Sequence, residues 1–407
     1  IINEYRNPKH NVRQKCTVCS CDFEEPTITF PNFPITELYV TKAPEETLGF
    51  VDQFFHFCRN CTHGELQNII APELLYNDSY STRTSKSESA QRSIDVFQKF
   101  LLGDIRNTNL LNTVIEIGCN DTFLLKQLSS KAKNLIGIDP ILKYTENISD
   151  KKITLIGDFF ENVSINLPKN QIDLVICSQT LEHIEDPKTF VMNALELGHD
   201  ETIFAFQFPG LESLVRDCRF DQIHHQHYNY FSVKSISTFL NDLGAEILNI
   251  GIDNYHWGTI MVTFKKAKKA KLQKLESREP DLLTKDYIGF QYSLFTGMMN
   301  SSEEIVSSRI KHYENVYGYG AALMLPLLKY HIPVLGDLKA IFDDDPNKIG
   351  KTYMNYDIPI TDGANLAKYK NYPIVVTAVN SKINYRTIIA KLMNNEVMDI
   401  ITPVVFM

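Results

Sequence analysis

Val114-Ile115-Glu116-Ile117-Gly118-Cys119-Asn120-Asp121 is the stretch of sequence that decides the fold. Its β-branched apolar residues predict a short buried strand with Glu116 at its tip, followed by a tight turn into a helix that Asp121 opens. Gly118 would let a ligand approach the backbone closely. A phosphate-binding loop would need more glycine and usually a lysine. The carboxylates here instead suit a ligand with positive charge and ribose hydroxyls, such as S-adenosylmethionine (SAM).

Three further apolar runs follow at the intervals of βα units, and polar residues come after each. Asp139 follows the first run, at the place where doubly wound folds bind ribose hydroxyls. Asp158 and Phe159 follow the second, an acid beside an aromatic ring that suits an adenine. The third leads into Ser-Gln-Thr-Leu-Glu-His at 178–183. The three expected strands are Leu135–Ile138, Ile153–Ile156 and Ile172–Cys177. The expected cofactor contacts are Glu116, Gly118, Asn120, Asp121, Asp139, Asp158, Phe159 and Gln179.

Composition limits the class of protein. The chain has 407 residues and a formal net charge of −8, which argues against a nucleic-acid partner because such proteins are usually basic. No apolar run approaches the roughly 20 residues of a membrane helix, and residues 1–6 lack the apolar core of a secretory signal. Eight cysteines in so long a chain are not a disulfide scaffold. We expect a cytoplasmic protein with no membrane partner, and a monomer.

Two Cys-x-x-Cys pairs lie in the N-terminal quarter, at 16–19 and 58–61. Paired knuckles of this kind predict a tetrahedral zinc ion, and four thiolates leave no open position, so the zinc should be structural. Cys21 could compete with Cys19, and His56 and His63 are close enough in sequence to replace a cysteine. Four cysteines without a metal are the alternative. The expected ligands are Cys16, Cys19, Cys58 and Cys61.

A polar segment rich in serine and threonine runs from Ala71 to Arg92. It is expected to lead into a helix over about 87–102. It is either a solvated linker or a lid that contributes hydroxyl groups to a polar substrate. Tyr76 and Tyr80 are its candidate substrate contacts.

Three histidines and two tyrosines fall within residues 224–230, after an expected strand at 202–206. No helical or strand period places all of them on one apolar face. The segment could be a catalytic loop with one histidine acting as general base near its unperturbed pKa. It could be a metal site, although His224 and His225 point apart and Asp221 is the only nearby carboxylate in the sequence. It could also be a polar surface loop. We favour the catalytic interpretation.

With these motifs the sequence resembles the three-domain SAM-dependent C-methyltransferases of deoxysugar biosynthesis, which methylate carbon 3 of a nucleotide-linked 4-ketosugar. The resemblance covers nearly the whole chain. It rests on the two cysteine pairs, the turn at 116–121 and the Phe220–Ser232 segment. It also rests on Tyr255-His256-Trp257-Gly258-Thr259, similar to a family H-G-G-S element, and on Gly318–Ala321 and Asp344–Lys351.

The resemblance implies that a base removes the proton from carbon 3 and that the enolate attacks the methyl group of SAM. It gives the role of base to His227, with His224, His225 and Gln226 shaping the acceptor pocket. It also implies a nucleotide-sugar partner. The substrate contacts expected from it and from the segments above are Tyr76, Tyr80, His183, Gln207, His256, Trp257, Thr259, Tyr319, Asp344 and Lys348.

The sequence departs from the family at several of these positions. The family's Y-H-E-H is His224-His225-Gln226-His227 here, and a glutamate of the family is Gln207. Gln226 can exchange hydrogen bonds but cannot move a proton. Trp257 replaces a glycine, and so does Thr122, which a helix N-terminus should tolerate. These changes leave open an O- or N-methyltransferase of a polar metabolite, or a catalytically silent nucleotide-sugar binding protein.

The expected fold is α/β: a Rossmann-like class I SAM-methyltransferase domain between a small zinc-binding module and a C-terminal Rossmann-like domain. A long helix over about 281–313, Gly318-Tyr319-Gly320 and an expected strand at 338–342 indicate the last of these. Such a domain could also be structural, without a ligand. The expected boundaries are 1–75, 76–265 and 266–407.

Overall fold

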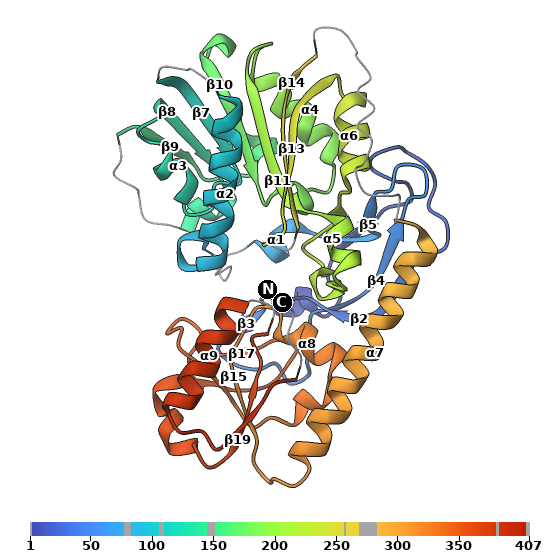
Figure 1. Cartoon of the computed structure of the whole chain (residues 1–407), viewed down its shortest axis with the longest axis vertical. Helices are drawn as coiled ribbons and strands as arrows, with labels where there is room; N and C mark the ends of the chain where they lie inside the picture. Colours follow the sequence, from blue (N-terminus) through green and yellow to red (C-terminus); the bar gives the residue numbers. More distant parts are fainter. Residues whose placement is uncertain are drawn as a thin grey trace.

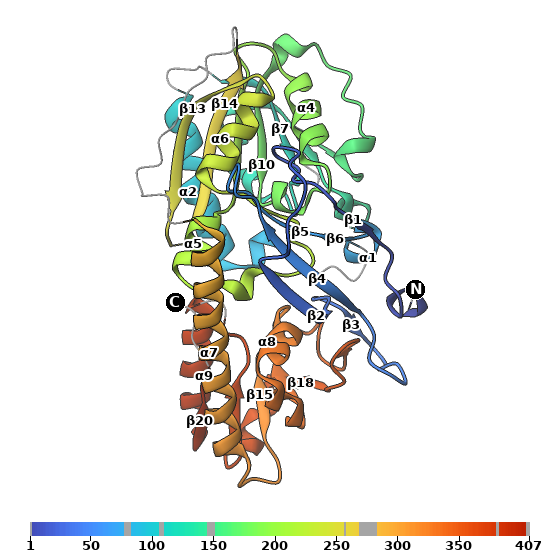
Figure 2. The ribbon, with the colours of Figure 1, turned by 90° about the vertical axis from the view of Figure 1, so that its right-hand side faces the viewer.

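The structure is a computed structural model, and it describes residues 2–76, 83–105, 110–144, 151–255, 258–267, 283–379 and 382–403. In Figure 1 a seven-stranded sheet forms the upper half and a five-stranded sheet the lower half, with the blue N-terminal strands between them. The long helix α7 runs alongside the lower half, as Figure 2 shows. Its bounds are Lys285–Ile310.

The upper sheet has the order β13-β14-β11-β10-β7-β8-β9. Its strands β7 to β11 are parallel, whereas β14 runs antiparallel to β11 and pairs with β13 in a hairpin. The strand order reverses between β7 and β10, which is the switch point where doubly wound folds bind ligands. The strands are β7 Leu111–Ile117, β8 Ala132–Ile138, β9 Ile153–Ile156, β10 Ile172–Ser178, β11 Ile203–Pro209, β13 Ala245–Asp253 and β14 Thr259–Lys266.

The sequence of β7 explains its central place, because both of its faces are apolar. Val114 packs in the cluster that contains Phe97 of α2, and Ile115 packs in the cluster that contains Phe190 of α4. Ser87 caps α2 by accepting the Ala90 N–H at 3.3 Å. The four strands expected after the first motif are all present, and β11 extends to Pro209, so Gln207 lies inside the strand rather than after it. The upper helices are α2 Glu88–Asp104, α3 Phe123–Gln127, α4 Pro187–Leu197, α5 Leu211–Arg216 and α6 Val233–Asp242.

The N-terminal strands pair with segments from both other parts of the chain. The four-stranded sheet has the order β12-β5-β4-β2. Its edge strand β12 comes from residues 224–230, called the histidine segment below. The short strand β3 pairs with β17, which belongs to the C-terminal segment at 266–407. The elements are β1 His10–Val12, β2 Ile28–Pro34, β3 Tyr39–Val40, β4 Phe50–Phe57, β5 Gly64–Leu66, β6 Asn68–Ile70, α1 Pro72–Leu75, β12 Asn229–Tyr230 and β17 Thr352–Tyr353. The expected first segment, 1–75, therefore completes its sheets with residues beyond its own boundary.

The lower sheet is entirely parallel, with the order β18-β16-β15-β19-β20. The strand expected at 338–342 is instead β16 at Ile341–Asp343, because Leu338 follows a 3-10 turn that ends at Asp337. The remaining elements are β15 Tyr317–Tyr319, α8 Leu325–His331, β18 Ile360–Asp362, β19 Pro373–Val376, α9 Lys382–Asn394 and β20 Asp399–Ile401. Among the helices in the described ranges, none combines the length and hydrophobicity needed to cross a bilayer.

Candidate active site

Glu116 lies at the end of β7, where it is buried and has an unsatisfied oxygen. Its side chain is 3% exposed, and its Oε2 has no hydrogen-bond partner among the described residues. Burial, and then the charges of Asp139 and Asp121, raise the pKa of Glu116 well above its usual value. Three carboxylates thus meet at the switch point of the sheet, and this arrangement favours a positively charged ligand.

The turn after β7 is held by backbone hydrogen bonds to Asp139. The Asn120 N–H donates to Asp139 Oδ2 at 2.8 Å, and the Ile141 N–H donates to its Oδ1 at 3.0 Å. Asp139 thereby fixes the turn as well as lining it. Two further bonds cover the turn: the Thr84 N–H donates to Asn120 Oδ1 at 3.1 Å and the Ser85 N–H to Asp121 Oδ2 at 2.9 Å. The end of the predicted lid or linker segment therefore packs on the turn after β7, at 118–122, which is called the cofactor turn below because SAM is expected there.

Gly118 and Thr122 both have left-handed backbone conformations in this turn. Gly118 has φ +75°, and a Cβ there would lie 2.0 Å from Thr180 Oγ1, so the close approach of Thr180 requires glycine. Thr122 is the N-cap residue of α3, as a helix N-terminus allows. It has φ +66°, its side chain makes no capping bond, and its hydroxyl donates to the Asp121 carbonyl at 2.6 Å. A residue with a Cβ is strained in this left-handed region, which explains why the family has glycine there.

Asp158 and Gln179 have different surroundings. Hydrogen bonds from the Asn162 side chain and the Phe159 N–H lower the pKa of Asp158, and Lys143 Nζ lies 3.3 Å from it. Asp158 is therefore paired and half-exposed, with Phe159 beside it. The Gln179 N–H donates to the Gln207 carbonyl at 2.9 Å, and its own side-chain nitrogen is buried without a partner in the described chain. Gln179 thus offers a free amide near the switch point.

The histidine segment separates into two groups. His225 points to the N-terminal sheet, where Nδ1 lies 3.1 Å from Gln53 Nε2 and Nε2 lies 3.0 Å from the Phe33 carbonyl. Both ring nitrogens are therefore occupied, and the geometry is that of a structural residue rather than of the acceptor pocket predicted for it. The rings of His224 and His227 instead lie together, with their centroids 4.0 Å apart.

His183 joins His224 and His227. Its ring centroid is 4.9 Å from that of His227, and its Nδ1 is 2.7 Å from the Gln226 carbonyl. Burial lowers the pKa of His183 to about 4 and that of His224 to about 3, and it places the pKa of His227 well below its usual value. The expectation of a base near its unperturbed pKa is therefore wrong for these three histidines. All three imidazoles are neutral at pH 7.

The glutamines of the site are held by hydrogen bonds. Gln226 Oε1 accepts from the Thr36 hydroxyl at 2.5 Å and lies 3.0 Å from His224 Nδ1. Gln207 Nε2 donates to Ser178 Oγ at 2.7 Å, and its Oε1 has no partner in the described residues. Asp221, the carboxylate noted in the sequence, accepts two bonds from Arg219 and lies outside this cluster. The carboxylate that does lie close to His183 and His227 is Glu182. Its position next to His183 in the sequence could have indicated this.

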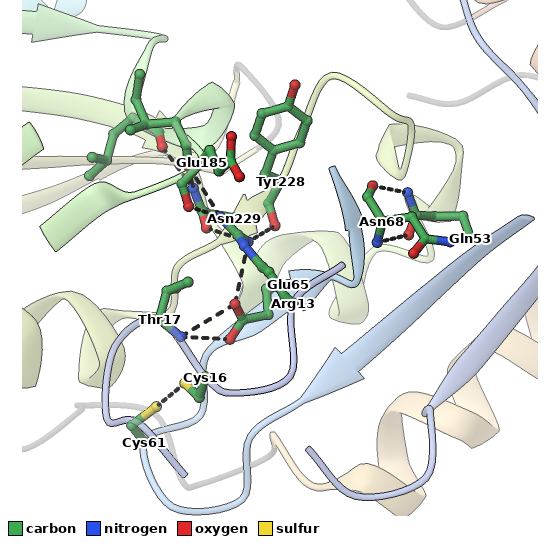
Figure 3. Close-up of polar contacts among 12 residues, drawn as sticks. Arg13, Cys16, Thr17, Gln53, Cys61, Glu65, Asn68, Glu185, Tyr228 and Asn229 are labelled. Atoms are coloured by element: carbon green, nitrogen blue, oxygen red, sulfur yellow. Dashed lines mark hydrogen bonds and ion pairs between the residues drawn. The ribbon is translucent and has the colours of Figure 1, made fainter. Parts of the chain in front are cut away.

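A buried ion pair links the cysteine region to the histidine segment (Figure 3). Arg13 Nη1 lies 3.3 Å from Glu65 Oε2 and donates to the Tyr228 carbonyl at 3.2 Å and to Asn229 Oδ1 at 3.0 Å. Glu65 also accepts the Thr17 N–H at 3.1 Å, between the two cysteines of the first knuckle. Sequence reasoning missed this network because neither Arg13 nor Glu65 belongs to a motif.

The sulfur atoms of Cys16, Cys19, Cys58 and Cys61 converge. All four lie within 4.8 Å of one another, with Cys16 and Cys61 Sγ 3.5 Å apart and Cys19 and Cys58 Sγ 3.4 Å apart. A tetrahedral zinc ion with bonds of about 2.3 Å needs sulfur atoms about 3.8 Å apart, so the four residues fit that ion. His56 and His63 are not part of the cluster.

The other expected substrate contacts are spread over the molecule. Tyr76 follows α1, with its ring centroid 6.0 Å from that of His183. Thr259 is buried at the start of β14, opposite Pro209. In the lower sheet the Tyr319 hydroxyl donates to Asp344 at 2.9 Å, and Lys348 Nζ donates to the Ala321 carbonyl at 2.9 Å. Tyr80, His256 and Trp257 lie outside the described residues.

Residues 88–250 match the family model described as a methyltransferase domain. The match covers β7 to β11, the cofactor turn and the histidine segment. The chain carries a SAM-dependent methyltransferase domain. The fold of this domain is the class I, Rossmann-like one expected from the sequence.

A curated relative of this chain is C-methyltransferase NovU from Streptomyces niveus. It is 24% identical over 254 residues, which are 61% of this chain and 60% of the relative. Among solved structures, magnesium protoporphyrin IX methyltransferase (ChlM) from Synechocystis PCC 6803 is 17% identical with a TM-score of 0.34, covering 44% of this chain and 84% of its own. N-methyltransferase NodS from Bradyrhizobium japonicum WM9 is 12% identical with a TM-score of 0.34, covering 44% and 97%.

Proposed function

We propose that this protein transfers the methyl group of SAM to a carbon atom of a nucleotide-linked ketosugar. The observation that carries the proposal is the pairing of two features at one end of the upper sheet. A carboxylate group around Glu116 suits the charged cofactor, and a cluster of neutral imidazoles around His227 suits proton removal. The relative named as a C-methyltransferase supports transfer to carbon, and the family resemblance of the motifs supports the sugar.

In this proposal SAM binds at the carboxyl ends of β7 and β8. Its ammonium and sulfonium groups would face the carboxylates of Glu116 and Asp121, whose buried oxygens lack partners among the described residues. Asp139 would bind the ribose hydroxyls, and Asp158 with Phe159 would contact the adenine. Asn120, Gly118 and Gln179 complete the proposed contacts.

The proposed reaction uses His227 as proton acceptor. The 4-keto group acidifies the hydrogen on carbon 3. As that C–H bond breaks, the proton passes to a neutral ring nitrogen of His227. The carbon then attacks the methyl group, forming a C–C bond while the S–CH₃ bond breaks and S-adenosylhomocysteine leaves. Hydrogen-bond donors must stabilise the negative charge that develops on the enolate oxygen.

We further propose a structural zinc ion at Cys16, Cys19, Cys58 and Cys61, with Cys21 free. When bound, the ion supplies folding energy to the N-terminal segment. Native protein is expected to contain one zinc ion by metal analysis, and a Cys58→Ala/Cys61→Ala variant is expected to lose it. Absence of zinc from native protein, or its full retention in the variant, would contradict this proposal.

The domain boundaries remain a proposal: 1–75 for the zinc module, 76–265 for the methyltransferase domain and 266–407 for a Rossmann-like substrate domain. Tyr319, Asp344 and Lys348 of the last would form the far wall of the nucleotide-sugar site. The nucleotide sugar is the proposed partner, and the expectations of a monomer and of a cytoplasmic location stand as predictions.

The test is incubation of candidate nucleotide-ketosugars with SAM in H₂O and in D₂O, followed by mass spectrometry. A mass gain of one methyl group, with deuterium entering carbon 3 when SAM is omitted, is expected for the enolate route. Transfer of a methyl group to oxygen or nitrogen, without exchange at carbon 3, would replace this proposal by the second candidate. Gln226, which cannot relay a proton, is the observation that favours that second candidate.

A further inference from the structure

Glu182, His183 and His227 bring three metal-ligand groups to one point. Glu182 and His183 lie on a 3-10 helix at Leu181–His183 after β10, and His227 lies in the turn before β12. One carboxylate oxygen and one nitrogen from each ring lie within 4.8 Å of one another. His183 and Glu182 are 44 and 45 residues from His227 in the sequence, so only the tertiary structure makes the cluster.

Glu182 is the most unusual member of the cluster. Its side chain is 2% exposed, and its Oε2 has no hydrogen-bond partner in the described residues. A buried carboxylate without a partner is costly unless a cation or a proton neutralises it. His183 Nε2 lies 3.8 Å from Glu182 Oε1. Burial raises the pKa of Glu182 to about 8, which reflects the cost of a buried charge that lacks a partner.

His183 is oriented as metal-binding histidines are. Its Nδ1 lies 2.7 Å from the Gln226 carbonyl, which can only accept a hydrogen bond, so Nδ1 carries the proton. Nε2 therefore keeps its lone pair, on the side of Glu182. Ligating histidines usually donate their other N–H to a carbonyl or a carboxylate in this way. His227 supplies the second imidazole, with its ring edge-on to that of His183.

The two segments that carry the cluster are clamped together. The Tyr228 N–H donates to the Glu182 carbonyl at 2.7 Å. Asn229 Nδ2 donates to the Leu181 carbonyl at 3.1 Å and to the Ile184 carbonyl at 2.7 Å. The clamp brings the ligand groups together before an ion arrives, which lowers the cost of forming the site.

We propose that Glu182, His183 and His227 bind one divalent transition-metal ion. This site is separate from the four cysteines. Two imidazoles and one carboxylate suit Zn²⁺, Co²⁺ or Fe²⁺ and leave positions open for water or a ligand oxygen. Bonds of about 2.0–2.1 Å would place the three ligand atoms about 3.4 Å from one another.

A second consequence rests on the proposed function. A metal ion on His227 would use the lone pair that accepts the proton from carbon 3. Metal binding and proton removal then exclude each other, and the bound ion holds the enzyme inactive.

The test adds Co²⁺ to protein whose zinc content has been measured, and counts bound cobalt by metal analysis after gel filtration. The wild type is expected to bind one Co²⁺ without loss of zinc, with weak visible absorption and without the strong charge-transfer band of cobalt thiolate. Glu182→Gln and His183→Gln are expected to weaken Co²⁺ binding at least tenfold, about 1.4 kcal/mol or more. The matched control His312→Ala removes an exposed histidine and should bind Co²⁺ as the wild type does.

Circular dichroism shows which variants are folded, and the comparison uses the folded one of the two. No cobalt in the wild type, or wild-type affinity in a folded Glu182→Gln or His183→Gln variant, would overturn the site. The cobalt-binding measurement needs no substrate, so its outcome is independent of whether the protein acts on a nucleotide sugar. With a methylated substrate in hand, added Co²⁺ should inhibit turnover, and full activity of cobalt-loaded protein would overturn the inhibitory role.

Discussion

The upper and lower sheets both place acidic residues near the ends of parallel strands. The two sheets differ in how many of the carboxylate oxygens have hydrogen-bond partners. In the upper sheet Glu116 Oε2 and Asp121 Oδ1 are buried without a partner among the described residues. In the lower sheet Asp343 accepts the N–H groups of Ala321 at 2.6 Å and of Asp345 at 2.8 Å. Asp344 accepts from Tyr319 and pairs with Lys391.

This difference separates a site prepared for a cation from a structural turn. A buried carboxylate with an unused oxygen is costly, and the cost falls when a positive ligand binds. A carboxylate whose oxygens already accept hydrogen bonds gains less from binding a cation. We therefore expect cofactor binding and chemistry to depend on the upper sheet, and the lower sheet to contribute only to substrate affinity.

The largest expected difference is in the turnover rate, between variants of His227 in the upper half and of Tyr319 in the lower sheet. His227→Ala should lower the turnover rate by about 10²–10⁴, because it removes the proton acceptor, and should leave SAM affinity nearly unchanged. Tyr319→Phe should raise the KM for the nucleotide sugar with little effect on kcat. Steady-state kinetics and calorimetry measure both. Wild-type turnover in His227→Ala would contradict the role of base, and loss of SAM binding would show that the residue is structural.

A smaller difference, in SAM affinity, is expected between variants of Asp139 and of Asp343. Asp139→Asn should weaken SAM binding about 10- to 100-fold, because charged hydrogen bonds contribute roughly 1.5–3 kcal/mol. Asp343→Asn should change SAM affinity less than twofold, since Asp343 lies at the end of β16 in the lower sheet and not at the proposed SAM site. Calorimetric titration with SAM measures both variants. Equal losses in the two would show that the contrast between the sheets does not govern cofactor binding.

The raised pKa of Glu116 predicts a pH-dependent affinity for SAM. Burial, and then the charges of Asp139 and Asp121, raise the pKa of Glu116 well above its usual value and so favour its protonated form. The positive charge of SAM favours the ionised form, so binding should release a proton, and affinity should rise with pH by at most about tenfold per unit. Calorimetry in buffers of different ionisation enthalpy measures the proton. Glu116→Gln should abolish its release, and uptake of a proton by the wild type would contradict the assignment.

The smallest effect is expected at the turns themselves. The lower sheet has Gly320 at φ +104° after its first strand, whereas the upper turn has Thr122 at φ +66°. Thr122→Gly should relieve left-handed strain and change the free energy of unfolding by less than about 1 kcal/mol, in the stabilising direction. Urea denaturation measures it. A loss of more than that amount would show that the buried Thr122 methyl group outweighs the strain.

The sequence alone determined the elements whose signal is local. Val114, Ile115 and Ile117 predicted β7, and the later apolar runs predicted the next strands along the chain, because a strand buried on both faces is largely apolar. The two Cys-x-x-Cys pairs predicted a cluster of four sulfurs, because knuckle spacing fixes which side chains can share a metal ion. Each of these signals lies within a few consecutive residues.

Only the tertiary structure decided what depends on contacts between distant segments. It brought Glu182 and His183 close to His227. It also directed the His225 side chain to the N-terminal sheet, although His225 and His227 are only two positions apart in the sequence. It also placed Thr122 in a left-handed turn, where no local propensity would put threonine. Burial, hydrogen bonding and pKa at these positions arise from long-range packing, and hydrophobic periodicity along the chain carries no record of it.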